Sequence, residues 1–185
     1  MAGGAVIAEM DRMPSDEGME AKIKKALVIK NERSFEDDPM YGIRQLVDIA
    51  LRALSPGIND PTTAEYCLLH IGDALGFLAS RRFPENRREF PGNPVKFILN
   101  SPGWDDYIRF SLDQIRGAIN DKPRIIAVVL HVIDHIAENA VSWERARILK
   151  EELEELRLMS EKGDFSRGDK DKLVASISHV EKKLA

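Results

Sequence analysis

Apolar residues recur every three to four positions along most of the chain, which is the spacing of one buried face of an α-helix. Proline and glycine interrupt this spacing at intervals and divide the chain into about seven helical segments. The most apolar of them, Pro39 to Leu54 and Pro61 to about Ser80, are joined by a short loop, which favours antiparallel packing. The pattern therefore predicts a mainly α protein, a helical bundle of about six or seven helices.

A few short segments have the composition of strands. Val95 to Leu99 is rich in β-branched and aromatic residues, and a strand is not stable without a partner. We expect that partner in Ala5 to Ala8 or in Leu27 to Lys30, because Arg81 to Pro94 has the charge and proline content of an exposed loop. The sequence thus predicts a minor β element in addition to the bundle.

The composition is that of a folded domain. The chain has 185 residues, of which 43% are hydrophobic and 31% are charged. We expect residues 1–30 to form a partial strand and helix lead-in, and residues 31–185 to form a single helical domain. The longest apolar run, Ile125 to Leu130, is far shorter than the roughly 18 residues that cross a membrane. A net charge of -4 argues against nucleic acid as a partner.

Polar residues gather in the loop between the two most apolar helices. Asn59, Asp60 and Thr62 precede or begin the second helix, and Ser55 follows the first. Free amides at a helix start bind anions, and carboxylate, amide and carbonyl oxygens bind hard cations. The same residues also serve as helix caps and turn formers, so both interpretations stay open.

A second polar segment precedes the hairpin. Asp37 and Asp38 lie where a helix dipole favours negative charge, and Arg33 has a planar fork that suits carboxylate or phosphate. A charged capping segment is the simpler interpretation. The sharper hypothesis is one ligand pocket to which both segments and one helix residue contribute. Its expected members are Arg33, Asp37, Asp38, Arg44, Ser55, Asn59, Asp60 and Thr62.

Asp113 and Arg116 complete the candidate ligand-binding residues. Their spacing predicts an ion pair within one helix, or a buried cluster that reaches Arg44, Asp48 or Arg52.

His131 and His135 share a helical face, as two metal ligands do, but the spacing shows no third ligand. Cys67, the single cysteine, lies on an apolar helical face and is expected to pack in the core. The sequence alone defines no metal, no cofactor and no catalytic residue.

Two stretches carry a resemblance to a known family. Residues 33–39 and 42–64 read RSFEDDP and GIRQLVDIALRALSPGINDPTTA. They resemble the signature of bacterial predicted membrane proteins grouped as domain of unknown function 2254, and residues 113–116 resemble a weaker second element. The resemblance covers about Gly3 to Leu156. It implies transmembrane helices followed by a water-facing region like this one, on the cytoplasmic side of the inner membrane, and it implies no activity.

The predicted membrane helices are missing from this chain. We therefore expect an excised water-facing region, with a soluble relative as the alternative. The leading hypothesis is a non-enzymatic regulatory region that senses a ligand or ion. One alternative is a hydrolase that uses Asp37, Asp38 or Asp60 of the same pocket, and another is an oligomerisation module. The expected partners are the protein's own transmembrane region or the membrane surface, and a second copy of the chain.

Overall fold

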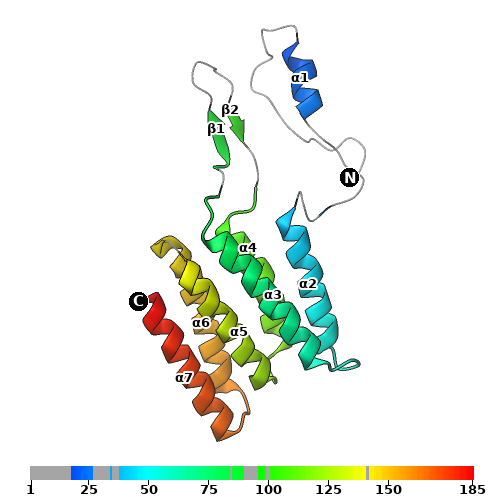
Figure 1. Ribbon diagram of the computed structural model, residues 1–185. Coiled ribbons are helices and arrows are strands. Elements are labelled where there is room, and N and C mark those ends of the chain that lie inside the picture. Colours follow the sequence, from blue (N-terminus) through cyan, green and yellow to red (C-terminus); the bar gives the residue numbers. More distant parts are fainter. Residues whose placement is uncertain are drawn as a thin grey trace. The chain divides into compact units, whose positions relative to one another are not determined.

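The structure is a computed structural model that describes residues 18–26, 34, 38–83, 85–89, 96–98, 101–140 and 142–185 (Figure 1). It divides into two compact units, which are treated separately. The first consists of Met1–Arg33 and Glu85–Asn100, and the second of Ser34–Pro84 and Ser101–Ala185. The predicted boundary near residue 30 lies close to the division at Arg33, while residues 85–100 fall within the first unit.

The first unit contains helix α1 (Met19–Ala26) and the antiparallel strands β1 (Arg87–Glu89) and β2 (Lys96–Ile98). Strand β2 lies where the sequence predicted a strand, and Phe97 in β2 is opposite Arg88 in β1. Its partner, β1, lies in the stretch that the sequence predicted to be a loop. The residues of β1 are all charged, so their composition did not indicate a strand. The expected partners, residues 5–8 and 27–30, lie outside the described residues.

The described residues of the second unit form a bundle of six helices in two layers, which confirms the predicted mainly α fold. Helices α2, α3, α5 and α7 lie side by side in one layer, and α4 and α6 pack behind them (Figure 1). The helices are α2 (Pro39–Leu54), α3 (Pro61–Ala79), α4 (Trp104–Ala118), α5 (Pro123–Asn139), α6 (Trp143–Lys162) and α7 (Arg167–Leu184).

Local sequence signals set the helix starts. Asp38 caps α2 by accepting a hydrogen bond from the Tyr41 backbone N–H at 3.1 Å, and Pro39 occupies the first helical position. Asp60 and Pro61 repeat this arrangement at the start of α3. The predicted cap-then-proline pattern is therefore confirmed at both helices.

The core lies between the two layers and consists mainly of aliphatic side chains, with Trp104 and Tyr107 also buried in it. Leu68, Ile71 and Leu75 of α3 are fully buried in one continuous cluster with residues of α4 and α5. Cys67 is buried in the same cluster, as predicted, and burial raises the pKa of its thiol.

Helices α3 and α5 approach each other closely at two glycines. A Cβ atom at Gly72 would lie 3.2 Å from both γ-carbons of Val132, and one at Gly76 would lie 3.2 Å from Nε2 of His135. A larger residue at Gly72 would press on the buried Val132, whereas at Gly76 it would meet the partly exposed His135 side chain.

Candidate functional site

Backbone hydrogen bonds within the loop between α2 and α3 hold its two ends together. The Asp60 N–H donates to the Ala53 carbonyl at 2.8 Å, and the Asn59 N–H donates to the Ser55 carbonyl at 2.8 Å. Asn59 has a φ of 49°, in the left-handed region that asparagine tolerates better than most residues. The Ser55 hydroxyl donates to the Arg52 carbonyl at 2.7 Å. These contacts make the loop a compact helix connection.

The Asp60 carboxylate is used as the cap of α3. It accepts hydrogen bonds from the Thr63 backbone N–H at 3.1 Å and from the Thr63 hydroxyl at 2.5 Å. These two bonds lower the pKa of Asp60 below its ordinary value, because they favour the ionised carboxylate. Thr62 is exposed on the first turn of the helix. The capping interpretation of Asp60 is thus confirmed.

The structure does not bring the predicted pocket residues to one point. Asp38 precedes α2, whereas Asn59 and Asp60 follow its other end, and a 16-residue helix is about 24 Å long. The expectation of a single point was wrong because residues that are close in sequence flank the two ends of one helix. Arg44 lies within α2, and its guanidinium stacks 4.9 Å from the ring centre of Phe110 in α4. Arg33 and Asp37 lie outside the described residues.

Asp113 and Arg116 form the predicted ion pair within α4, with 2.9 Å between Oδ1 and Nη2. Arg116 also donates to the carboxylate of Glu152 in α6. The Glu152 side chain is only 4% exposed, and this burial raises its pKa although Arg116 opposes the shift. The partner of Arg116 across the bundle is therefore Glu152, which the sequence did not indicate because it lies 36 positions away in a charge-rich helix.

His135 lies near two carboxylates. Its Nε2 is 3.7 Å from Asp73, and its Nδ1 is 3.8 Å from Glu138. Within the ranges that the structure describes, no group of three or more His, Cys, Asp or Glu side chains is arranged to hold a metal ion.

Arg145 of α6 caps the C-terminal end of α3. Its guanidinium donates to the backbone carbonyls of Ala79 and Arg81, and lies 5.4 Å and 5.8 Å from the ring centres of Phe83 and Trp104. The Trp104 indole N–H donates back to the Arg145 carbonyl at 3.2 Å. A cation at the end of a helix also complements its dipole. We therefore assign Arg145 a structural role.

A groove of about 800 Å³ runs between α3, α5 and α7, and we call it the α3–α5–α7 groove. Apolar residues and charged side chains both line it. The lining residues are Glu65, Leu69, Pro123, Arg124, Ala127, Val128, His131, Asp169, Lys172 and Leu173. Sequence reasoning missed this groove because the lining comes from three separate helices and from no motif. Leu69, which is 39% exposed in the structure, was not singled out by the sequence.

Charges at the groove are partly paired. Arg124 forms a two-pronged ion pair with Glu65, in which Nη2 and Oε2 are 2.9 Å apart. Asp169 accepts a hydrogen bond from the Ser166 hydroxyl at 2.7 Å. Lys172 is exposed, and no carboxylate in the described part of the chain pairs with it. The groove thus combines apolar walls with an available cation.

These features define the class of the molecule as a two-layer helical bundle with a surface groove and capped polar loops. The chain belongs to the family described as "Predicted membrane protein (DUF2254)", which matches residues 1–135. The described part of the chain contains no helix with the length and hydrophobicity that a bilayer crossing requires.

Curated relatives extend this comparison. Uncharacterised proteins of Mycobacterium tuberculosis (strain ATCC 25618 / H37Rv) and Mycobacterium bovis (strain ATCC BAA-935 / AF2122/97) are each 36% identical to this chain over 114 residues. The match covers 62% of this chain and 22% of each relative, so it spans about a fifth of the relatives' length. No solved structure matches the chain.

Proposed function

We propose that this bundle is a non-enzymatic ligand-sensing region of a membrane protein, and that its ligand binds in the α3–α5–α7 groove. The observation that carries the proposal is the groove itself. Its volume of about 800 Å³ falls within the roughly 300–1,000 Å³ that small-molecule sites occupy. Like such sites, the groove combines apolar lining residues with polar groups that can orient a ligand.

The lining favours a small amphipathic anion, such as a medium-chain carboxylate. Leu69, Ala127 and Val128 offer apolar surface to a hydrocarbon chain. Lys172 and His131 also line the groove, where they can meet an anionic head group. The negative charge of Glu65 is balanced by its ion pair with Arg124, and Asp169 accepts a hydrogen bond from Ser166.

The hydrolase alternative receives less support from the same geometry. Catalysis by a carboxylate needs a group whose pKa lies near the working pH. Asp38 and Asp60 are helix caps, and the pKa of Asp60 is lowered rather than raised.

The cytoplasmic position of the region remains a prediction.

Thermal unfolding with octanoate, octanol and inorganic phosphate tests the proposal. A ligand at 100 times its Kd stabilises a protein by about 2.7 kcal/mol, or roughly 5–10 °C for a chain of this size. We expect octanoate to raise Tm and octanol to raise it much less, because only octanoate carries a charge for Lys172. Lys172→Gln should lower the octanoate effect, whereas Lys150→Gln on the exposed face of α6 should not. An octanoate shift that is the same in both variants contradicts the assigned site, and no shift contradicts the ligand class.

A further inference from the structure

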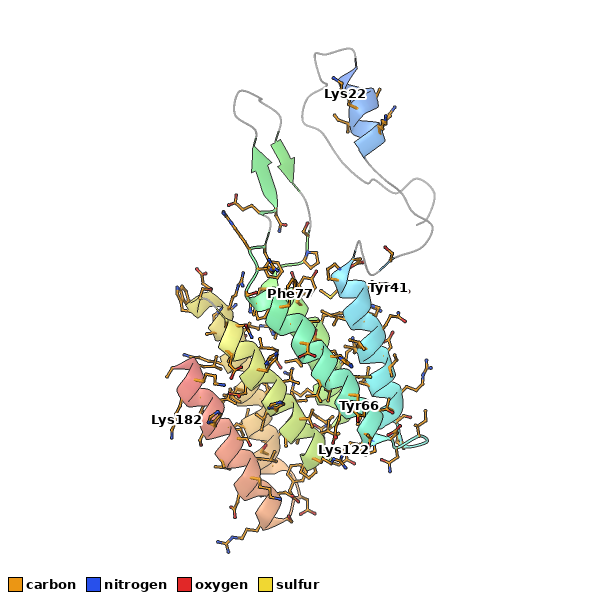
Figure 2. All side chains as sticks on the ribbon, viewed as in Figure 1. Lys22, Tyr41, Tyr66, Phe77, Lys122 and Lys182 are labelled. Atoms are coloured by element: carbon orange, nitrogen blue, oxygen red, sulfur yellow. The ribbon has the colours of Figure 1, made fainter. Side chains whose placement is uncertain are left out.

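Four exposed side chains follow one another along the outward face of α3, and we call them the α3 stripe. Tyr66, His70, Asp73 and Phe77 are 64%, 68%, 70% and 59% exposed. Their spacing places them on one side of the helix. Figure 2 shows Tyr66 and Phe77 toward opposite ends of α3. These two exposed rings lie on a helix whose other faces form the core, and each offers apolar surface to a partner; the Arg81 guanidinium lies 4.3 Å from the centre of the Phe77 ring.

The chemistry of the stripe is symmetric about its middle. From one end to the other it reads aromatic ring, imidazole, carboxylate, aromatic ring. Each ring lies about 8 Å along the helix from the level of Ile71 and Gly72, and the imidazole and carboxylate each lie about 2 Å from it. A two-fold axis at that level, perpendicular to the helix, places Tyr66 opposite Phe77 of a second copy. The same axis places His70 opposite Asp73.

We propose that a second copy of this chain binds the α3 stripe, with its own α3 running antiparallel. A two-fold interface requires a surface that complements itself, so that residue i meets j and residue j meets i. The stripe meets this requirement twice over, with aromatic pairs at both ends and imidazole–carboxylate pairs at the centre. Aromatic pairs favour association beyond the area that they bury.

The imidazole and the carboxylate of the stripe lie close together on the helix surface. In Asp73, Oδ2 is 3.8 Å from Nδ1 of His70, and Oδ1 is 3.7 Å from Nε2 of His135 in α5. This carboxylate therefore stands between two imidazoles and remains open to a third. A partner that presents a carboxylate to His70 and an imidazole to Asp73 adds to these contacts, which favours a second copy over an unrelated apolar partner.

Helix α3 alone is too small for a stable dimer. A 19-residue helix is about 28 Å long and about 10 Å wide, whereas stable interfaces cover about 800 Å² on each partner. The neighbouring helices of the layer must add surface, and the exposed Ile49 of α2 lies on one of them. Association of the isolated chain is accordingly expected at micromolar concentrations or above.

Charge substitution at the two rings tests the proposal by sedimentation equilibrium of the full chain. Tyr66→Lys and Phe77→Glu should each weaken association at least tenfold. The double variant should recover most of that loss, because the axis brings the two new charges together. Trp143→Glu, at a ring that is 76% exposed on α6, is the matched control and should change nothing. Circular dichroism verifies that every variant is folded.

Disulfide trapping tests the register separately. In a Cys67→Ala background, chains with Tyr66→Cys are mixed with chains with Phe77→Cys. We expect mixed dimers to form much faster than dimers of either kind alone, since identical positions lie about 16 Å apart along the helices. A chain that stays monomeric at several hundred micromolar overturns the proposal. A double variant that is as weak as the singles, or equal trapping in all mixtures, also overturns it.

Discussion

At the scale of single residues, the polar side chains near α2 and α3 act mainly on helix ends. Asp38 and Asp60 accept from backbone N–H groups at helix starts, and Arg145 donates to carbonyls at a helix end. Each satisfies backbone groups that a helix leaves without partners. These contacts explain why several acids and arginines lie beside the most apolar segments of the chain.

Replacing the α3 cap should lower stability in a pH-dependent way. Hydrogen bonds from Thr63 hold the pKa of Asp60 below its ordinary value of 3.8 in the folded state. The ionised cap therefore stabilises the fold above that value, and this contribution disappears as the pH falls through the lowered folded-state pKa. We expect Asp60→Ala to lower Tm at pH 7, with a difference from wild type that shrinks in acid. Asp60→Asn keeps an acceptor and is the control, and an Asp60→Ala deficit that is independent of pH would contradict the role of the ionised group.

Removing Arg116 should leave a buried charge without its partner. Glu152 is nearly inaccessible and pairs with Arg116, so Arg116→Ala should cost about 3 kcal/mol in urea unfolding at pH 7. Burial already raises the pKa of Glu152, and loss of the arginine raises it further. The folded variant then binds a proton more tightly than the unfolded chain, so its stability rises as the pH falls through that raised value.

The double variant Arg116→Ala/Glu152→Gln separates charge from packing. It removes the unpaired charge, so we expect it to recover part of the lost stability at pH 7 and to lose the extra pH dependence. A double variant that is less stable than Arg116→Ala at pH 7 would show that the buried charge is not the cause.

At the scale of elements, the contact between α3 and α5 depends on two glycines with different neighbours. Val132 is buried and β-branched, so it has essentially one side-chain conformation in a helix and cannot move away from a new Cβ at Gly72. His135 is partly exposed and can rotate away from Gly76. Alanine also favours the helix over glycine by up to about 1 kcal/mol.

Gly72→Ala and Gly76→Ala should therefore have different effects. We expect Gly72→Ala to lower the free energy of unfolding and Gly76→Ala to leave it unchanged or raise it by up to about 1 kcal/mol. Chemical denaturation of both variants with matched wild type measures the difference. Equal effects at the two positions would contradict the proposed role of Val132.

Elements defined by local signals were predictable, and contacts between distant elements were not. The starts of α2 and α3 followed from Asp38–Pro39 and Asp60–Pro61, because a cap and a proline act on their own helix turn. The pairing of Arg116 with Glu152 and the lining of the groove depend on how the helices pack, which periodicity does not encode. The expected pocket failed for the same reason, since its members were joined by sequence proximity alone.

At the scale of the whole molecule, the bundle extends beyond the part that matches the family. The match ends at residue 135, inside α5, yet α6 and α7 pack directly against α4 and α5. These last two helices supply eight buried aliphatic residues to the common core. They are Ile148, Leu149, Leu153, Leu156, Leu173, Ile177, Val180 and Leu184.

A chain shortened to residues 1–140 should therefore not form the native bundle. Each buried aliphatic side chain contributes about 1.5–3 kcal/mol, so the eight together contribute about 12–24 kcal/mol, which is at least as large as most of the 5–15 kcal/mol stability range of an ordinary domain. We expect the shortened chain to lose its cooperative thermal transition and to bind a hydrophobic dye, because the apolar faces of α4 and α5 would be open to water. A separate polypeptide of residues 141–185 should restore the transition when added in excess. A cooperative transition in the shortened chain within a few degrees of the full chain would instead show that α2 to α5 form a self-sufficient core, with α6 and α7 as an addition on its surface.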